Sequence, residues 1–391
     1  METIKKLFSI EQTKTHNIYR IFGIKIAFYD KKREFAETDA SKYIQDSLDL
    51  SGLQNSKKVV VFFVPYETKI CGGIMSIFSL CQTTRKICPD SFCAISTFPN
   101  GKTYVINDKF HNNEKVLRFE QIVNNAKNVE ELILHIPEYF AGDFYNSLNE
   151  KDIAFLKSVR NLQINILNQN IEIMPDCDKL QGLYKLTDNV TQTIAHDRYA
   201  TQEVCDKWQM PTHFFSAYWD MSSYRSYSFE EKEKIIVLSP DTNENKSNIV
   251  SKLENEFKDW KIVTVNNLTF SQYMDLISRA FFVITFGEGF DGYFVQPPKV
   301  NGIGFAVYND NFFPNPKWLD MPNVFKSYED MENNIVDVFK NLSTNKELYC
   351  NLSKLNNQKQ NELYSAEQYE DNLKRFYQKK YDFLPLKEKN K

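Results

Sequence analysis

Residues 281–292 read FFVITFGEGFDG, and this stretch decides the fold. Its first half, Phe281–Thr285, is a continuous apolar run with the length and composition of a buried β-strand. Its second half, Gly287–Gly292, is a loop with three glycines, and we expect a helix to follow as far as about Lys299. A glycine loop lets the backbone approach a ligand closely, and a helix start offers free N–H groups and a positive dipole end. The stretch therefore predicts a phosphate site at the end of a parallel strand.

The sequence around this loop alternates in the same way between strand and helix patterns. Apolar β runs are separated by segments with helical spacing, which is typical of parallel strands joined by helices on both faces of a sheet. The expected strands are Lys234–Leu238, Trp260–Val265, Phe281–Thr285 and Gly304–Tyr308, and the expected helices are Asn248–Phe257 and Ser271–Arg279.

A similar alternation occupies the first half of the chain. Lys58–Pro65 (KVVVFFVP) is an apolar run, and Cys71-Gly72-Gly73 leads into a segment of helical spacing, which is the opening of a βαβ unit. Further strands are expected at Glu131–Ile136, Asn161–Leu167, Val190–Ala195 and Thr212–Ala217. Tyr218–Phe229 is rich in Ser and Tyr and lacks a period, which predicts an interdomain linker.

We therefore predict an α/β protein with two Rossmann-like, doubly wound parallel-sheet domains that face a cleft, and a small N-terminal β-hairpin at 17–29. The expected parts are a basic hairpin segment over 1–34, a first Rossmann-like domain over 35–225, a second over 226–365, and a C-terminal helix with a basic tail over 366–391. In open parallel sheets ligands sit beyond the carboxyl ends of the strands, so the residues directly after each strand are the site candidates.

Composition and charge exclude several classes of protein. A net charge of −3 argues against a general nucleic-acid binder, which would show a clustered basic excess. The chain has no apolar run of about 18 residues and no apolar secretory signal, so we expect a cytoplasmic protein. Seven Cys without a C-x-x-C pair are typical of reduced thiols. The D-x-D match Asp176-Cys177-Asp178 follows Met-Pro in a loop, and we expect neither a metal nor a cofactor.

Both ends of the chain are basic, and the C-terminal end also carries an apolar stripe. Lys and Arg outnumber Asp and Glu by eight to three over 1–33 and by seven to two over 374–391. The stripe consists of Tyr369, Leu373, Phe376, Tyr377 and Tyr381. We favour a last helix that packs across the domains, and the alternative is a peripheral helix on the inner membrane surface, with the basic N-terminal segment attracted to anionic lipid.

Residues 235–305 resemble the donor half of the retaining GT-B glycosyltransferases that carry a Glu-x7-Glu signature. The shared order is strand, loop with a lysine, helix, strand, helix, strand, the Gly-Glu-Gly-Phe of 287–290, helix, and Asn301-Gly302 before the last strand. By this resemblance Glu288 holds the donor sugar and the amides of Phe290–Gly292 hold phosphate. Gln296 replaces the second acid and, about two helical turns on, can still hydrogen-bond the ribose.

The resemblance extends more loosely to the first half, which becomes the acceptor domain. The N-terminal Phe22-Gly23-Ile24-Lys25 is similar to the hairpin attached to sugar transferases of bacterial capsule and lipooligosaccharide gene clusters. The implied activity is transfer of a sugar, with retention, from a nucleotide-sugar to a bacterial surface glycan or glycolipid. Alternatives on the same fold are a nucleotide-sugar epimerase, a polyol-phosphate transferase, and a catalytically silent sugar-nucleotide-binding partner, which Gln296 makes conceivable.

The candidate site residues follow from strand ends and from the resemblance together. The catalytic candidates are Glu288 and His135. The donor-binding candidates are Gly72, Gly73, Ser239, Lys246, Gly287, Gly289, Phe290, Asp291, Gly292 and Gln296. The acceptor-binding candidates are Glu138, His196 and Arg198. The alternatives are simple turns for the glycines, a solvated Lys246, and structural hydrogen-bonding roles for the two histidines.

Overall fold

The computed structural model describes residues 8–12, 16–21, 24–29, 40–66, 71–101, 103–110, 113–216, 218 and 220–386. The first strands, β1 (Phe8–Gln12), β2 (His16–Ile21) and β3 (Ile24–Tyr29), form a separate antiparallel sheet in that order. Strands β2 and β3 are the expected hairpin, and β1 adds a third strand that the sequence analysis did not predict.

The first domain contains a seven-stranded parallel sheet with the order β10-β9-β8-β7-β4-β5-β6. Its strands are β4 (Lys58–Val64), β5 (Phe92–Thr97), β6 (Val116–Arg118), β7 (Glu131–Pro137), β8 (Asn161–Asn168), β9 (Val190–Ile194) and β10 (Thr212–Phe214). The central strand β4 is buried from its second residue onward, as expected for an apolar run covered on both faces.

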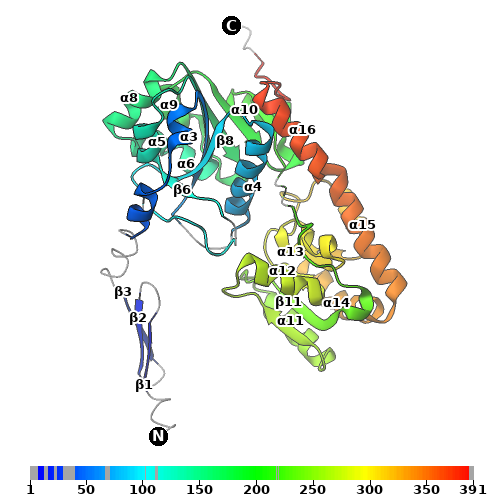
Figure 1. Cartoon of the computed structure of the whole chain (residues 1–391). Helices are drawn as coiled ribbons and strands as arrows, with labels where there is room; N and C mark the ends of the chain where they lie inside the picture. Colours follow the sequence, from blue (N-terminus) through cyan, green and yellow to red (C-terminus); the bar gives the residue numbers. More distant parts are fainter. Residues whose placement is uncertain are drawn as a thin grey trace.

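The two faces of this sheet carry two separate hydrophobic cores, as side-chain alternation along a strand requires. On β4, Val60 and Phe62 belong to one core, and Val59 and Phe63 belong to the other. Helices α4 (Gly72–Ile87) and α16 (Ala366–Tyr377) cover the first face (Figure 1). The remaining helices are α3 (Ser51–Asn55), α5 (Phe119–Asn125), α6 (Glu138–Ala141), α7 (Phe144–Ser147), α8 (Glu150–Ser158), α9 (Cys177–Tyr184) and α10 (Gln202–Trp208).

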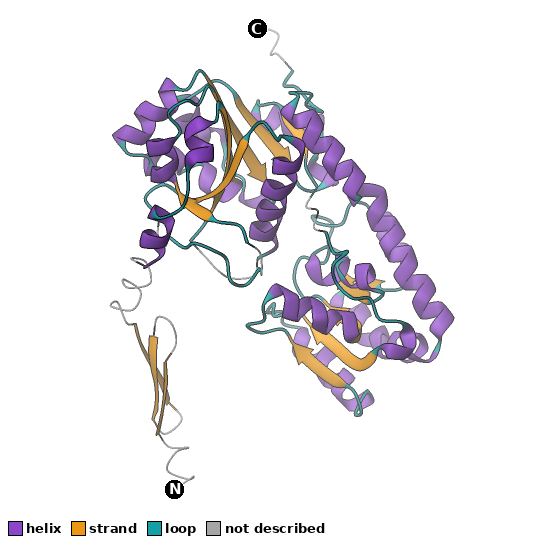
Figure 2. Ribbon diagram, in the orientation of Figure 1, coloured by secondary structure: helices purple, strands orange, loops and turns teal. Residues whose placement is uncertain are grey.

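The second domain contains a five-stranded parallel sheet with the order β12-β11-β13-β14-β15. Its strands are β11 (Glu233–Leu238), β12 (Lys261–Thr264), β13 (Ala280–Ile284), β14 (Ile303–Val307) and β15 (Val324–Phe325). Its helices are α11 (Lys246–Glu256), α12 (Phe270–Arg279), α13 (Gly292–Val295), α14 (Tyr328–Thr344) and α15 (Lys346–Tyr364). Figure 2 shows both sheets enclosed by helices, and the predicted fold class is confirmed.

The last helix leaves the second domain and packs on the first. Helix α15 runs along the second domain and α16 continues from it onto the face covered by α4 (Figure 1). Tyr369, Leu373 and Phe376 are at most 2% exposed, so these three residues of the apolar stripe are buried against protein, and Tyr377 and Tyr381 are partly buried. Beyond α16, Phe383 pairs with Thr212 at the edge of β10. No helix in the described part of the chain is long and apolar enough to cross a bilayer.

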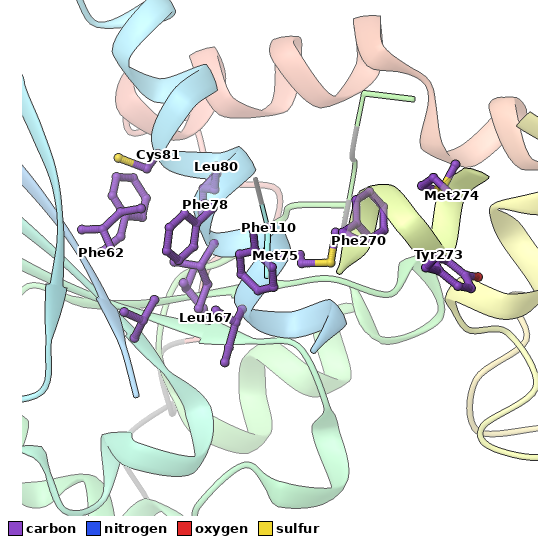
Figure 3. Packing of buried hydrophobic residues seen from close by; sticks show 14 of the residues in the cluster. Phe62, Met75, Phe78, Leu80, Cys81, Phe110, Leu167, Phe270, Tyr273 and Met274 are labelled. Carbon is purple, nitrogen blue, oxygen red and sulfur yellow. The ribbon is translucent and has the colours of Figure 1, made fainter. Parts of the chain in front are cut away.

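An apolar contact joins the two domains beside the start of α4. Met75 and Phe110 of the first domain lie beside Phe270, the first residue of α12, in one continuous hydrophobic cluster (Figure 3). The Phe270 amide also donates a 2.8 Å hydrogen bond to the Lys109 carbonyl. This contact places the start of α4 next to the helix that leads into β13.

Candidate functional site

The glycine loop after β13 has a backbone that only glycine adopts easily at one position. Gly289 has a φ of +91°, in the left-handed region that L side chains rarely occupy. A Cβ atom there would also stand 2.7 Å from the Val307 carbonyl oxygen. The loop is therefore fixed tightly against the end of β14.

The helix after this loop is much shorter than predicted. Helix α13 ends at Val295 and a 3-10 turn over Pro297–Val300 replaces its continuation to Lys299. Two successive prolines explain the difference, because proline lacks the N–H that would continue the α-helical hydrogen bonds. The expectation that Gln296 lies two helical turns along one helix is therefore wrong.

Asp291 caps α13 and uses part of the expected anion site. Its carboxylate accepts hydrogen bonds from the amides of Tyr293, at 2.9 Å, and Phe294, at 3.3 Å. The amides of Glu288–Gly292 donate no hydrogen bond to any described residue. Five consecutive amides at the carboxyl edge of β13 are therefore unpaired within the described part of the chain.

The loop is acidic on the side of Gly287. A Cβ atom at Gly287 would lie 2.9 Å from an Asp241 carboxylate oxygen and 3.3 Å from one of Asp291. Burial, together with the nearby charge of Asp241, raises the pKa of Asp291 to about 7, against the opposing effect of its hydrogen bond from Thr285 Oγ1. This carboxyl therefore changes charge close to neutral pH.

Glu288 is exposed and faces the first domain. The surrounding protein atoms raise its pKa by desolvation, and the carboxylates of Glu172 and Asp241 add to the rise. Glu172 belongs to the first domain, in the 3-10 turn after β8, so Glu288 stands where the two domains approach each other. The Gln296 side chain lies over Gly292, because its amide nitrogen would be 3.1 Å from a Cβ there.

Ser239 and Lys246 hold the loop from behind rather than line it. Ser239 is fully buried, and its hydroxyl accepts a 2.9 Å hydrogen bond from the Phe286 amide. Lys246 Nζ donates to the Ser239 and Asp241 carbonyls at 2.6 and 3.0 Å and lies over the Phe286 ring. Desolvation lowers the pKa of Lys246. Direct donor contact by Ser239, predicted from its place after a strand, is thus wrong, because its side chain turns into the core.

Gly72 and Gly73 open α4 at the carboxyl edge of β4. Cys71, the residue before them, accepts no capping hydrogen bond with its side chain. The first amides of this 16-residue helix therefore have no side-chain cap. A Cβ at Gly72 would meet nothing within 4 Å, whereas one at Gly73 would collide with the Gln169 side chain. Gln169 in turn donates to the Gly73 carbonyl at 3.2 Å. The open side of this helix start is therefore at Gly72.

Glu138 is a buried carboxyl at the end of β7. It is 3% exposed, and desolvation raises its pKa to about 7. One carboxyl oxygen accepts from the Asn170 amide at 3.1 Å, and the other has no partner among the described residues. Glu138 therefore supports the loop after β8, which carries Gln169.

His135 does not point toward the space between the domains. It is fully buried, its ring stacks on Phe62, and its two nitrogens contact Asn165 and Tyr377. Desolvation lowers its pKa to about 3, so it stays neutral. The predicted catalytic or acceptor role is wrong, because alternation along β7 turns this side chain to the sheet face that α16 covers.

His196 and Arg198 contact the second domain instead of an open acceptor surface. The Arg198 guanidinium makes two 2.9 Å hydrogen bonds to the Asp310 carboxylate, and the His196 ring packs edge-on against Phe312. The neighbouring Glu172 accepts a 2.8 Å hydrogen bond from Asn311. These residues form a polar contact between the domains, separate from the apolar contact at Phe270.

Sequence reasoning missed Asp241 and Glu172, the two carboxylates that influence Glu288. Asp241 follows β11 directly after Ser239-Pro240, so the strand-end rule already pointed to it. Glu172 lies in an irregular turn and had no such signal. Among the described residues, no group of three or more His, Cys, Asp or Glu is arranged to hold a metal ion.

Comparisons with known proteins identify the fold. No protein-family model and no curated protein matches the sequence. A solved α-glucosyltransferase in complex with UDP-glucose and DNA containing an abasic site has a TM-score of 0.54 and 11% identity, over 81% of this chain and 100% of that one. Sucrose-phosphate synthase from Thermosynechococcus elongatus has a TM-score of 0.54 and 10% identity, over 82% and 98%. MnaA from S. aureus with UDP has a TM-score of 0.50 and 12% identity, over 84% and 99%.

At these identities the likeness shows the fold alone. The chain has the GT-B fold, with two parallel-sheet α/β domains of seven and five strands.

Proposed function

We propose that this protein is a glycosyltransferase that takes a sugar from a nucleotide-sugar and passes it to a glycan or glycolipid. The observation that carries the proposal is the run of unpaired amides at Glu288–Gly292, together with a start of α4 that no side chain caps and that packs near the first residue of α12. Backbone amides at the ends of parallel strands are a common anion site in α/β proteins. A pyrophosphate between these two backbone segments would accept hydrogen bonds from both.

The charges around the loop favour different positions for the two parts of the donor, its sugar and its phosphates. Cleavage of the sugar–phosphate bond leaves a negative pyrophosphate and a sugar ring with cationic character. Backbone amides can stabilise the negative charge of the pyrophosphate by hydrogen bonding, without a charged side chain. Dipoles that are oriented before the reaction are effective in catalysis. The carboxylates of Glu288 and Asp241 suit the cationic ring and would repel the phosphates. We therefore place the sugar at Glu288 and the phosphates at the amides.

The acceptor would enter from the first domain. Gln169, which follows β8, donates a hydrogen bond to the Gly73 carbonyl, and the Glu138 carboxylate holds the same loop. Catalysis would then consist mainly of holding the two substrates in line and stabilising the departing phosphate. The resemblance to Glu-x7-Glu enzymes favours retention, and the N-terminal segment favours a capsule or lipooligosaccharide acceptor.

A turnover assay with a matched pair of variants tests this proposal. The protein is incubated with a panel of nucleotide-sugars and surface-glycan acceptors, and free nucleotide and extended glycan are measured. Glu288→Gln should lower transfer by one to three orders of magnitude, roughly 1.4 kcal/mol for each, with little change in nucleotide affinity. Glu254→Gln, an exposed acid on α11, is the control and should leave transfer unchanged.

The outcomes separate the rival functions. Isomerised sugar without an acceptor would favour an epimerase, and nucleotide binding without turnover would favour a silent partner. Normal transfer by Glu288→Gln would assign that residue to the structure of the loop.

A further inference from the structure

We propose that the N-terminal sheet β1-β2-β3 binds the surface of a bilayer that contains anionic lipid. The strand pairing gives this sheet one apolar face. In antiparallel pairing, residues directly opposite each other share a face, and so do alternate residues along a strand. The residues that share the apolar face, all apolar except the two amides, are Phe8, Ile10, Gln12, Asn17, Tyr19, Ile21, Ile24, Ile26 and Phe28.

The opposite face and the flanks of this sheet carry the basic residues. Arg20 pairs with Lys25 on the opposite face, and the other six Lys and Arg of 1–33 lie outside the strands. With eight Lys and Arg against three Asp and Glu, 1–33 has a net charge of +5 at neutral pH. The same short segment therefore combines an apolar face with a strong positive charge.

The apolar face needs a partner. A small sheet of this kind is stable only when its hydrophobic face is buried. Among the described residues, the three strands make no extensive contact with any other strand or helix (Figure 1). An apolar face with charged residues around it is typical of a surface that binds a protein or a membrane.

The charge of the segment selects between these two partners. A second copy of the sheet, stacked face to face, would bring two segments of net charge +5 together. A bilayer with anionic lipid would instead attract each Lys and Arg near its surface. Stable attachment to a bilayer takes two signals, such as an apolar group and a basic patch, and this segment has both. The apolar face would contact the acyl chains, and the flanking basic residues would lie at the headgroups.

The helix over 40–46, which follows the sheet in the chain, supplies a second observation. Tyr43 is 77% exposed and Ile44 is 47% exposed, and the neighbouring Lys42 is exposed as well. Exposed Tyr and Lys side chains beside an aliphatic residue are typical of a membrane–water interface. Gln45 of the same helix is fully buried and donates a 2.6 Å hydrogen bond to the Val116 carbonyl. The helix is therefore fixed to the first domain, and the sheet and helix together would attach that domain to the bilayer.

Co-sedimentation of the full-length protein with lipid vesicles tests the proposal. One vesicle preparation contains phosphatidylcholine alone, and the other contains equal amounts of phosphatidylcholine and phosphatidylglycerol. The parent protein should bind the anionic vesicles at least tenfold more tightly at low salt, because several basic residues lie near the surface. Raising the salt to about 1 M, where the Debye length falls to about 3 Å, should remove most of this preference.

Ile26→Asp and Ala27→Asp form a matched pair of variants. They add the same charge to neighbouring residues of β3, one on the apolar face and one on the opposite face. Ala27→Asp should weaken binding to the anionic vesicles by up to about fivefold, the effect of one charge near the surface. Ile26→Asp should weaken binding by at least a further tenfold, because an isoleucine is lost from the buried face.

Ala27→Lys distinguishes lipid binding from a loss of folding. It adds a positive charge to the opposite face and should strengthen binding to the anionic vesicles by up to about fivefold, which a disrupted sheet could not do. Equal losses in Ile26→Asp and Ala27→Asp, or no preference of the parent for anionic vesicles, would overturn the proposal.

Sedimentation equilibrium without vesicles examines the alternative partner. We expect the parent and Ile26→Asp to have the same mass in solution. A parent dimer that dissociates in Ile26→Asp would show that a second copy covers the apolar face, and would also overturn the proposal. These measurements contain no nucleotide-sugar, so the turnover assay can fail without affecting this inference.

Discussion

Asp291→Asn should stabilise the protein, and by more at high pH than at low pH. The parent carboxyl has a pKa of about 7 in the fold against 3.8 for an unperturbed aspartate side chain, so folding favours its protonated form. A group of this kind lowers stability as the pH rises from its unfolded to its folded pKa. Linkage gives a penalty of about 4 kcal/mol at pH 8 and about 2 kcal/mol at pH 5. Both figures are upper limits, because the residue is only half-buried even though its carboxyl is enclosed.

Asparagine keeps the features that the structure needs at this position. Its side-chain oxygen can accept from the Tyr293 and Phe294 amides as the carboxylate does, so the cap of α13 survives. In the parent protein Thr285 Oγ1 donates a hydrogen bond to the carboxylate. In the variant the direction can reverse, with the asparagine amide group as the donor to Thr285 Oγ1. The variant therefore removes the buried charge without removing the cap.

Urea unfolding at pH 5 and pH 8, followed by circular dichroism, measures the effect. Asp176→Asn is the control, because Asp176 also precedes a short helix but makes no side-chain cap. We expect the stability gained by Asp291→Asn to be about 1–2 kcal/mol larger at pH 8 than at pH 5. An equal gain at both pH values, or a loss at pH 8, would show that the carboxyl is not enclosed and refute this account of the loop.

Two further predictions concern Gln296 and Lys232. Gln296→Ala should weaken binding of nucleotide-sugar and free nucleotide alike, by no more than roughly tenfold, because one neutral contact is lost; calorimetry showing parent affinity would make it a surface residue. Desolvation lowers the pKa of Lys232 to about 7, and its ammonium donates hydrogen bonds to the Ser278 and Val300 carbonyls. A lowered lysine pKa means that stability rises with pH, by about 2 kcal/mol from pH 7 to 9. Lys232→Met should flatten that part of the urea-unfolding pH profile, and an unaltered rise would assign it to other groups.

The strands with long apolar runs could be predicted because their signal is local, whereas β5, β6 and β15 were not expected from the sequence. An apolar run such as Lys58–Val64 has to be covered on both faces, and that requirement specifies a parallel sheet without knowledge of the helices. The glycine loop was predictable for the same reason, since it directly follows β13. Even the short α13 carried a local sign, the pair Pro297-Pro298, which outweighs the helical pattern before it.

The parts of the site that could not be predicted depend on distant partners. His135 meets Tyr377, 242 residues later in the chain, and nothing near His135 indicates which sheet face that helix will cover. Arg198 pairs with Asp310 across the domains, and a charge alone does not indicate whether its partner is protein or substrate. Asp291 was assigned to the ligand although an Asp before Gly-Tyr-Phe also matches a helix cap.

The pairing of Phe383 with Thr212 has a consequence for how the chain is made. The first domain is synthesised first, but β10 and the face under α16 remain uncovered until about 170 more residues have emerged. At ribosomal rates of roughly 5–20 residues per second, this interval lasts on the order of 10–30 s. During it, Phe215 and the His213 ring lack the covering that Phe376 later supplies. The amino-terminal half therefore exposes this apolar face until α16 has been made, and a nascent chain stalled within 220–365 should be a substrate for chaperones.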